Sequence, residues 1–418
     1  MTRSPRRDLL RPQLSSSFFS SPPPSSSIIT RASPPSSSSP SSLEASASAW
    51  DLKYDTPLPH GVSLTQGPRE EMEDFVAVVP RARCGYLYAA VFDGHAGSAA
   101  ARFLADRLYP ALSQTIEETN YVDCELPPMT STSSDEASNS KDSTQAQAQQ
   151  NLATASLDGL CCPVDISPAL AATFDALDVD LLKYLKSLPD PPERDAGSTA
   201  TVVLARKGRI VAANVGDSRA VLCRGGVAVD LTTEHRVYGK SAAASSEASR
   251  VKAAGGWLDD GRVCGVLAVS RAFGDPGLKR AGLGATLRQG VEDGAWTEEF
   301  ARERQAIGFE ADPVVPTPDV TALATTDRDE FVVVASDGLW DVLPSRDAVR
   351  VARAALRKGV GPAGAAAALA EAAVKRRTPD NVAVVVVDLK GDGGWGGGGE
   401  SGSGGEKKKK KGWSLFGG

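Results

Sequence analysis

Residues 86–97 read YLYAAVFDGHAG, an apolar run that ends in Asp93 and His95. The first seven residues are aromatic or aliphatic, and this composition is typical of a buried strand. Aspartate is rare within strands, whereas an Asp-Gly step commonly closes a turn. The stretch therefore predicts a buried strand that presents a carboxylate, with a histidine in the loop that follows it.

Four further runs share the features of this strand, and three longer segments carry the spacing of helices. The strand-like runs are Thr199 to Ala205, Ile210 to Val215, Phe331 to Ala335 and Val382 to Val387. The helix-like segments are Ala99 to Leu112, Ala169 to Leu188 and Arg346 to Arg357. We therefore expect an α+β fold. No internal repeat is visible, which excludes solenoids and propellers.

The composition predicts one compact body with low-complexity ends. Of the 418 residues, 41% are hydrophobic and 23% charged, as in ordinary globular proteins. Residues 1–43 contain sixteen Ser, five Arg and one acidic residue, which favours an organellar transit peptide, with a disordered tail as the alternative. Residues 113–165 predict a disordered insertion, and residues 390–418 a Gly-rich linker followed by a Lys-rich tail. The folded domain is expected at 44–389.

The charge distribution limits the partners of this body. Residues 1–43 and 389–418 carry +4 and +3, so with a net charge of −6 the residues between them carry −13. Such an acidic body repels phosphate backbones, so we expect no nucleic acid partner. We also expect a monomer. No stretch reaches the roughly 18 apolar residues that a membrane-spanning helix needs, so we expect none. The run Lys407 to Lys411 leaves peripheral contact with an anionic membrane open, with a solvated tail as the alternative.

Four aspartates lie at the ends of the predicted strands: Asp93, Asp217, Asp337 and Asp380. One Asp-Gly step by itself indicates only a turn. Four such positions suggest that carboxylates converge at one rim, where their mutual repulsion is tolerated only if cations neutralise it. Oxygen ligands without a set of Cys and His favour Mg²⁺ or Mn²⁺ over Zn²⁺. The sequence therefore predicts a Mg²⁺ or Mn²⁺ site.

Other polar residues near these aspartates fit phosphate chemistry. His95 can donate a proton to a leaving oxygen. Upstream, Glu73 and Asp74 precede the apolar run Phe75 to Val79. If that run pairs beside the strand of residues 86–92, the two acids reach metal-bound water, and Arg69 holds a phosphate with its planar guanidinium. The alternative for these charges is a solvated surface.

Seven short motifs follow one another in a fixed order along the chain. They are Arg69 with Glu73-Asp74, Asp93-Gly94-His95-Ala96-Gly97, Gly197-Ser198-Thr199-Ala200, Gly216-Asp217-Ser218-Arg219, Ala268 to Asp275, Ala335 to Asp341, and Asp380-Asn381. This series resembles the metal-dependent type 2C protein Ser/Thr phosphatases from about Gly61 to Leu389. The resemblance implies an αββα sandwich of two antiparallel sheets flanked by helices, with a two-metal site at one end. It also implies a phosphatase domain at 44–389, with an insertion at 276–312 beside a flap.

The same resemblance implies a role for each site residue. The implied ligands of the two metal ions are Asp93, the Gly94 carbonyl, Asp337 and Asp380. Glu73 is implied to orient metal-bound water. Asp217, together with Asp337, matches the position of a third, weaker metal. The implied catalytic residues are His95 as general acid and Arg69 as phosphate ligand. The implied supporting residues are Asp74, Asp341 and Asn381. Together they predict hydrolysis of phosphoserine or phosphothreonine by water activated between two Mg²⁺ or Mn²⁺ ions.

A narrower resemblance is to the chloroplast thylakoid-associated members of this family, which dephosphorylate light-harvesting complex II. It rests on Tyr238, Arg250 to Trp257, Gly261 to Gly265 and Gly290 to Phe300. It implies a chloroplast protein, in the stroma or on the stromal face of the thylakoid membrane, that removes phosphate from antenna proteins and so reverses a state transition.

Two features depart from these patterns. The thylakoid enzyme ends in a hydrophobic membrane span, whereas this chain ends in the Lys-rich tail, which puts integral anchoring in doubt. Glu234-His235-Arg236-Val237 stands where the family usually has Asp-His-Lys-Pro, and we expect little consequence from it. The alternative to an active enzyme is a catalytically silent type 2C domain that acts as a binding or scaffold module. The intact carboxylates, His95 and Arg69 argue against this alternative.

Overall fold

The computed structural model describes four stretches of the chain, 57–123, 165–190, 192–391 and 394–395. All of them belong to the unit Ala49–Gly418. The predicted transit peptide at 1–43 lies outside the described residues, as do residues 124–164 of the predicted insertion and the Lys407 to Lys411 run.

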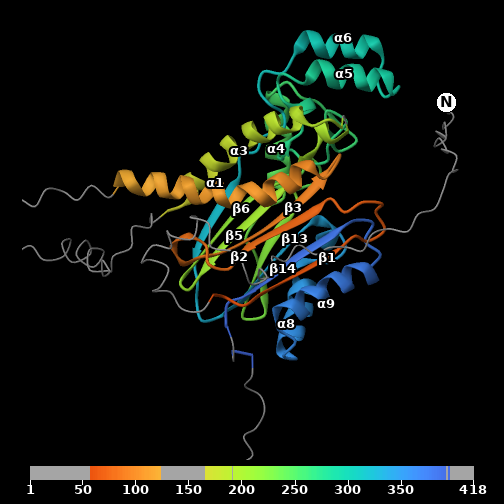
Figure 1. Ribbon diagram of the computed structural model, residues 1–418. Coiled ribbons are helices and arrows are strands. Elements are labelled where there is room, and N and C mark those ends of the chain that lie inside the picture. The colour runs from red at the N-terminus through yellow and green to blue at the C-terminus, as the bar shows by residue number, and fades with distance from the viewer. Residues whose placement is uncertain (1–56, 124–164, 191, 392–393, 396–418) are drawn as a thin grey trace, which may run out of the picture. The chain divides into compact units, whose positions relative to one another are not determined.

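Two antiparallel sheets stack face to face, with helices on both outer faces (Figure 1). The first sheet consists, in spatial order, of β1 (His60–Thr65), β14 (Val382–Asp388), β13 (Asp329–Ala335), β7 (Arg219–Arg224) and β8 (Val227–Asp230). The second consists of β11 (Phe273–Gly274), β4 (Gly197–Ser198), β3 (Leu87–His95), β5 (Ala200–Arg206), β6 (Arg209–Val215) and β12 (Asp319–Ala324), with β2 (Asp74–Val79) paired to β3. A small hairpin joins β9 (Leu258–Asp259) to β10 (Arg262–Val263).

Helices form the two outer layers. Packed on the second sheet are α1 (Ala99–Asp123) and α3 (Ser167–Ser187), and packed on the first sheet are α8 (Ser345–Arg357) and α9 (Gly361–Lys375). The remaining helices are α4 (Ala242–Ala253), α5 (Leu283–Glu292), α6 (Glu298–Ile307), α7 (Asp337–Trp340) and the short 3₁₀ turns η1 (Arg83–Gly85), η2 (Pro192–Asp195) and η3 (Pro276–Leu278). This arrangement confirms the predicted αββα sandwich. Within the described ranges, no helix combines the length and the apolar character needed to cross a membrane.

Strand β3 shows why the strand-like runs are apolar at every position. Leu87, Ala89 and Val91 join the core between the two sheets, whereas the residues that alternate with them join the core under α1 and α3. Successive side chains of a strand point to opposite faces, so a strand buried on both faces reads as one continuous apolar run. Each fully buried Leu or Val contributes about 1.5–3 kcal/mol, which holds the ends of these strands firmly in place.

Two predicted boundaries need correction. Strand β3 continues through His95, because Gly94 and His95 pair with β4, so these residues form a strand end rather than a loop. Helix α1 continues to Asp123, beyond the predicted end at Leu112. Leu112 and Ile116 lie one turn apart on the buried face of α1, and their packing against the second sheet extends the helix into the segment predicted as an insertion.

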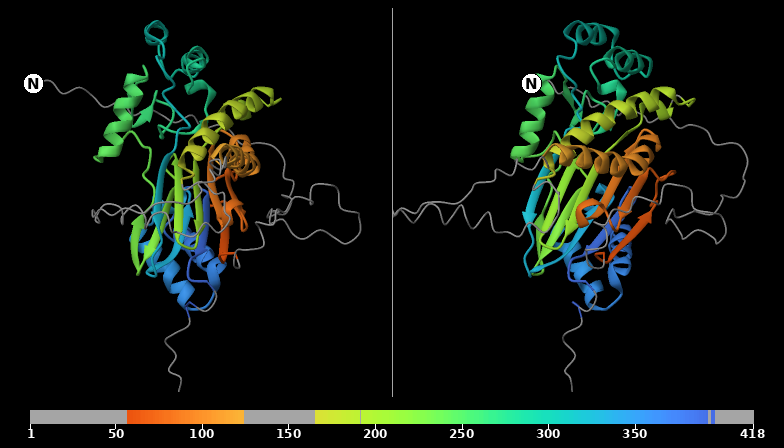
Figure 2. Two further views of the ribbon diagram at one scale, coloured as in Figure 1. Left: turned by 90° about the vertical axis from the view of Figure 1, so that its left-hand side faces the viewer. Right: turned by 60° about the vertical axis from the view of Figure 1, so that its left-hand side comes forward.

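Residues 231–318 form a lobe at one end of the strands, here named the flap, which contains α4, α5 and α6 (Figure 2). Its core is aromatic: the ring of Trp257 meets Trp296 at 5.6 Å and Phe300 at 5.5 Å, both edge to face. Gly290 makes room for this packing, because a Cβ there would lie 2.1 Å from a ring carbon of Trp296. The predicted insertion at 276–312 thus folds as η3, α5 and α6 around this aromatic core.

Candidate active site

Three aspartates converge at the flap end of the sandwich. Asp93, Asp217 and Asp337 each offer a carboxylate oxygen, and these oxygens lie within 4.8 Å of one another. They come from the end of β3, the turn between β6 and β7, and the first residue of α7. We refer to these three residues as the acidic cluster. The sequence predicted this convergence from the positions of the aspartates at strand ends.

Thr199 and two glycines fix the positions of these aspartates. The amide N–H of Asp93 donates to Thr199 Oγ1 at 3.2 Å, and Thr199 Oγ1 lies 3.0 Å from Ser218 Oγ, next to Asp217. Gly216 has φ +102°, and a Cβ there would lie 2.5 Å from Thr199 Cγ2, so only glycine fits. A Cβ on Gly338 would lie 1.8 Å from the carbonyl oxygen of Asn381. These glycines allow the turn and helix α7 to approach β5 and β14 closely.

Asp74 lies directly opposite Asp93, because β2 pairs with β3, which is the condition set from the sequence for Asp74 to reach the site. The Ser336 hydroxyl donates to Asp74 Oδ2 at 2.7 Å, and the Ala383 N–H donates to Ser336 Oγ at 2.9 Å. Asp74 is therefore buried behind the cluster and connects both sheets through Ser336. Its contacts suit a supporting role.

Glu73 and Asn381 tie the segment before β2 to the rest of the site. Gly94 N–H donates to the Glu73 carbonyl at 3.2 Å, and Gly97 N–H donates to Glu73 Oε1 at 2.7 Å. Glu73 N–H donates to Asn381 Oδ1 at 2.8 Å, and the Asn381 side-chain amide donates to the carbonyls of Gln66 and Glu71. Asn381 thus organises backbone, whereas the Glu73 carboxylate is held next to Gly94.

Arg69 and Asp380 form an ion pair with 2.6 Å between Arg69 Nη2 and Asp380 Oδ2. Arg69 Nε also donates to the Pro379 carbonyl at 3.3 Å. The Arg69 side chain is 51% exposed, so its guanidinium is anchored by a carboxylate and still accessible to a phosphate. Asp380 and Glu73 were predicted as metal-site residues but are not among the three aspartates of the acidic cluster.

His95 contacts the flap through Asp275, with 2.8 Å between Nε2 and Oδ1. Burial disfavours the charged imidazole, but the Asp275 carboxylate outweighs burial and raises the pKa of His95. Gly197 lies against this pair, because a Cβ there would lie 2.3 Å from His95 Nε2 and from Asp275 Oδ2. A histidine kept protonated by a buried carboxylate is suited to donate a proton. Asp275 closes the sequence motif Ala268 to Asp275, and the motif alone indicated no role for it.

Comparison with known proteins identifies the family. Residues 132–382 match the family model for protein phosphatase 2C. The chain is also 38% identical to Protein phosphatase 2C 57 of Arabidopsis thaliana over 80% of its own length and 76% of that protein.

The chain belongs to the protein phosphatase 2C family.

It is therefore a protein Ser/Thr phosphatase, and other relatives agree. Probable protein phosphatase 2C 68 of Oryza sativa subsp. japonica is 30% identical over 79% of this chain and 78% of that protein. A crystal structure of serine-threonine phosphatase 2C from Toxoplasma gondii shares the fold with a TM-score of 0.54 and 20% identity, over 79% of this chain and 97% of that one. The matched family segment begins after Arg69, Glu73, Asp93 and His95, so the family model does not cover these four residues.

The aspartates of this phosphatase repel one another. Burial and then the charges of Asp74 and Asp337 raise the pKa of Asp93 well above its ordinary value. Burial raises the pKa of Asp74 to about 7, and burial together with the charge of Asp217 raises the pKa of Asp337 to about 8. Divalent cations would relieve this repulsion. The donor set is all oxygen, and it fits the divalent metal ions that this family uses, in particular Mg²⁺ or Mn²⁺.

Arg236 lies among the acidic side chains, so the expectation of little consequence from the Glu234-His235-Arg236-Val237 motif is wrong. Its guanidinium contacts Asp217 at 3.0 Å, Asp337 at 3.3 Å and Asp341 at 3.0 Å. Asp341, predicted as a supporting residue, thus contacts the cluster through this arginine. The only signal in the sequence was the departure from the family motif at this position.

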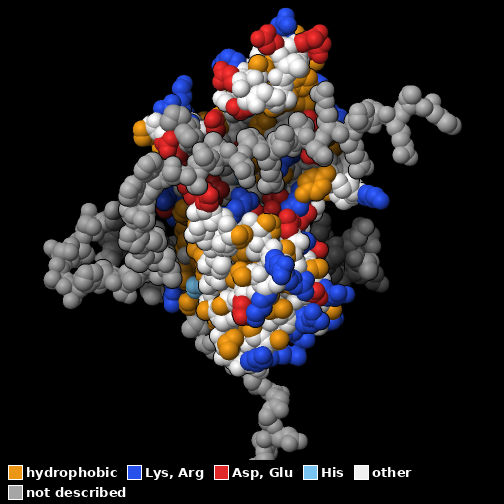
Figure 3. Space-filling model, turned by 90° about the vertical axis from the view of Figure 1, so that its right-hand side faces the viewer, with side chains coloured by type: hydrophobic (Ala, Val, Ile, Leu, Met, Phe, Trp, Pro, Cys, Tyr) orange, Lys and Arg blue, Asp and Glu red, His pale blue; other side chains and the backbone are white. Residues whose placement is uncertain are grey.

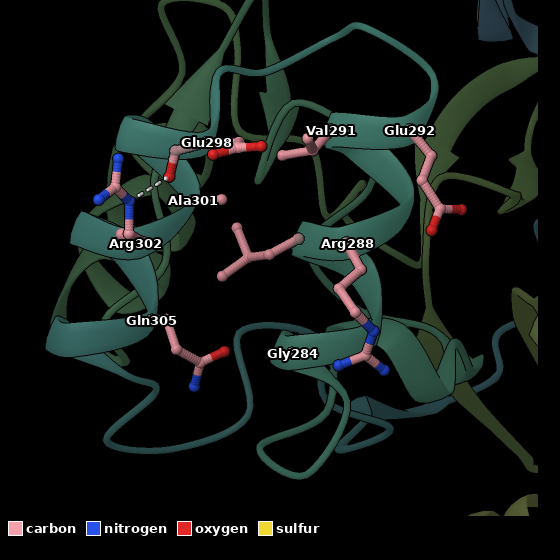
Figure 4. Close-up of a pocket in the computed structure, with 9 residues that line it drawn as sticks. Gly284, Arg288, Val291, Glu292, Glu298, Ala301, Arg302 and Gln305 are labelled. Carbon is pink, nitrogen blue, oxygen red and sulfur yellow. Dashed lines mark hydrogen bonds between the residues drawn. The ribbon is translucent and has the colours of Figure 1, made fainter.

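A pocket of about 390 Å³ lies between α5 and α6 of the flap (Figure 4). Leu287, Val291 and Ala301 contribute apolar surface, while Arg288 and Glu298 lie among its charged lining residues. None of its lining residues belongs to the predicted site. This pocket is therefore separate from the acidic cluster.

Proposed function

We propose that this phosphatase hydrolyses phosphothreonine and phosphoserine on chloroplast proteins, above all the antenna proteins of light-harvesting complex II. The observation that carries the hydrolytic part is the convergence of Asp93, Asp217 and Asp337, with His95 and Arg69 contributed by adjoining segments. The antenna part is supported by the likeness of the flap segments to the thylakoid-associated phosphatases. The Ser- and Arg-rich residues 1–43 support a chloroplast location.

Each site residue has a proposed task. The residues that would hold two Mg²⁺ or Mn²⁺ ions are Asp93, the Gly94 carbonyl, Asp337 and Asp380, with Asp217 beside Asp337 at a third, weaker position. When bound, such ions neutralise phosphate charge and lower the pKa of a water molecule enough to make it a nucleophile. Glu73, held by the Gly97 N–H, orients the attacking water.

The other residues bind the substrate and complete the reaction. Arg69 holds two phosphate oxygens with its planar guanidinium. Water attacks phosphorus, the bond to the seryl or threonyl oxygen breaks, and His95 gives that oxygen its proton. Asp74 and Asn381 keep the strand ends in register through Ser336 and the backbone around Glu73.

We further propose that the phosphatase acts as a monomer and contacts the thylakoid membrane peripherally. Residues 345–377, which span α8 and α9, contain eight Lys and Arg but two acidic residues. Lys and Arg side chains gather on the lower part of the face in Figure 3, where α8 and α9 lie. This basic surface and the Lys407 to Lys411 run would attract an anionic membrane at about 1 kcal/mol per residue near the surface. Release of the protein from thylakoids by high salt supports this contact, and retention after carbonate washing contradicts it.

A phosphate-release assay tests the activity itself. Full-length protein with Mn²⁺ should release phosphate from a phosphothreonine peptide, and excess EDTA should stop the release. Asp93→Asn is the matched control and should be inactive while remaining folded by circular dichroism. If the unmodified protein releases no phosphate from any phosphopeptide, the catalytically silent scaffold is the correct alternative.

Phosphorylated thylakoids test the substrate. After incubation with the full-length protein, antenna phosphothreonine bands should disappear before the bands of the photosystem core. Earlier loss of the core bands would keep the phosphatase activity and overturn the antenna assignment.

A further inference from the structure

Arg236 is held rigidly beside the acidic cluster. Its side chain is 15% exposed, Nη1 donates to the Tyr238 hydroxyl at 2.7 Å, and the guanidinium lies 5.6 Å from the centre of the Tyr238 ring. The preceding residue, His235, donates its N–H to the Gly216 carbonyl at 2.9 Å and accepts from the Gly216 N–H at 3.1 Å. These bonds fasten the backbone next to Arg236 to the turn that carries Asp217.

This guanidinium is shared between three carboxylates. Nε donates to Asp217 Oδ2, while Nη2 donates to Asp337 Oδ2 and Asp341 Oδ1. In the part of the chain that the structure describes, no other Lys or Arg forms an ion pair with any of these three aspartates. Arg69, the other arginine of the site, is paired with Asp380.

A guanidinium and a divalent cation compete for such carboxylates. A Mg²⁺ or Mn²⁺ ion needs oxygen ligands at about 2.0–2.2 Å, and the N–H groups of Arg236 already occupy the facing oxygens of Asp217 and Asp341. Like charges at such short distances repel strongly at the effective dielectric of a protein surface, and a divalent ion is repelled more than a monovalent one. A lysine at this position would be a flexible point charge, whereas the planar group of arginine bonds several carboxylates at once.

We propose that Arg236 is a built-in counter-cation that takes the place of the third, weaker divalent ion beside Asp217 and Asp337. The phosphatase then binds two divalent ions, and its charge balance at Asp217 comes from the protein itself. This inference rests on the proposed metal-binding role of the acidic cluster. It revises only the proposed third position and leaves the two-ion site unchanged.

Counting bound Mn²⁺ tests the inference without any activity measurement. Free Mn²⁺ is followed by electron paramagnetic resonance during titration of the full-length protein, of Arg236→Ala and of Arg236→Lys. The control is Arg357→Ala, which removes an exposed arginine of α8. We expect two bound ions for the unmodified protein and the control, and three for Arg236→Ala. Arg236→Lys should bind its third ion at least about tenfold more weakly than Arg236→Ala does, since the charge remains.

Each outcome separates the inference from the proposed function. Three ions on the unmodified protein, or the same number and affinities for Arg236→Ala, would overturn the role of Arg236 alone. No Mn²⁺ binding by the unmodified protein would overturn the metal site itself. If Arg236→Ala does not fold, as judged by its thermal transition, Arg236→Gln retains part of the side chain and is held to the same count.

Discussion

Glu247 is buried in the flap and Asp93 is half-buried in the acidic cluster, and their surroundings shift the pKa values of the two carboxyl groups in opposite directions. Glu247 accepts from Arg271 at 2.7 Å, from Arg250 at 3.0 Å and from the Ser270 hydroxyl at 2.6 Å. Burial alone would raise the pKa of Glu247, but these partners lower it to about 2. The pKa of Asp93 is raised by burial and by the charges of neighbouring aspartates.

The difference shows what each region is built for. The flap balances its own buried charges, so its ion pairs connect α4 to the segment around Ser270 and stabilise the folded lobe. In the acidic cluster the carboxylates repel one another, and Arg236 offsets part of this repulsion. The remaining repulsion destabilises the folded protein, and bound cations would stabilise it. Stability given up at a binding site is a common cost of function.

The largest effect is expected from Asp93→Asn, which removes one charge from the cluster. Phosphate release with Mn²⁺ should fall by at least about 10³-fold, because Asp93 is one of the residues proposed to hold the ions that would stabilise the transition state. In EDTA the same variant should melt about 2–4 °C higher, since one repulsive buried charge is gone. Calorimetry with and without Mn²⁺ measures this change. A lower melting temperature in EDTA would contradict the unbalanced repulsion.

A smaller effect is expected from Glu247→Gln, which removes the carboxylate that pairs with two arginines of the flap. Arg250 and Arg271 lose their shared charged partner, and the free energy of unfolding should fall by about 2–3 kcal/mol, less than for a fully buried pair because both arginines are partly exposed. Urea unfolding measures the loss. The control, Glu371→Gln, removes the exposed pair with Lys375 and should cost less than about 0.5 kcal/mol. Equal losses for the two variants would mean that the flap network adds nothing.

Local patterns predicted an α+β fold and much of the site, whereas the sandwich was implied by the resemblance of the motif series to the type 2C phosphatases. Continuous apolar runs marked the strands, and Asp-Gly or Gly-Asp steps marked the strand ends that carry Asp93, Asp217 and Asp337. The pairing of β2 with β3, which places Asp74 opposite Asp93, was only a condition at the level of the sequence, and the structure fulfils it.

The flap contributions to the site could not be predicted in this way. His95 meets Asp275 across 180 residues of chain, and Arg236 meets Asp337 across 101 residues. Hydrophobic period and turn chemistry extend over a few residues only, so they carry no information about such pairs. The end of α1 was also missed, because packing of Ile116 against the sheet, and not local composition, extends that helix.

Asp275→Asn tests the contact between the flap and His95, which lies beside the acidic cluster. Asp275 is a flap residue that acts through His95, and its loss should lower the pKa of His95 and free its ring. Turnover of a phosphothreonine peptide should fall by about 10–10²-fold, because the leaving oxygen needs a proton. Turnover of p-nitrophenyl phosphate should change little, since its leaving group departs as an anion. Equal losses on both substrates would assign Asp275 a purely structural role.

The smallest effect is on the pH dependence of the free energy of unfolding, to which the flap and the acidic cluster contribute differently. The pKa of Glu247 is about 2 in the folded protein, below its ordinary value of 4.5, so its stabilisation is complete above pH 4.5 and is lost as the pH falls toward 2. The free energy of unfolding should therefore decline across this window by at most about 1.4 kcal/mol per pH unit from this group. Glu247→Gln should remove that part of the slope in urea titrations.

Asp93→Asn is the matched control for the acid titration. Below about pH 3.8, the ordinary pKa of aspartate, it should leave the slope of the free energy of unfolding against pH unchanged. The raised pKa of Asp93 makes the folded protein bind its proton at higher pH than the unfolded chain does. Protonation of Asp93 therefore changes the free energy of unfolding only above about pH 3.8, and acidification below that pH causes no further change through this group. A slope altered by Asp93→Asn but not by Glu247→Gln would place the acid-sensitive charges in the cluster and reverse the comparison between the two regions.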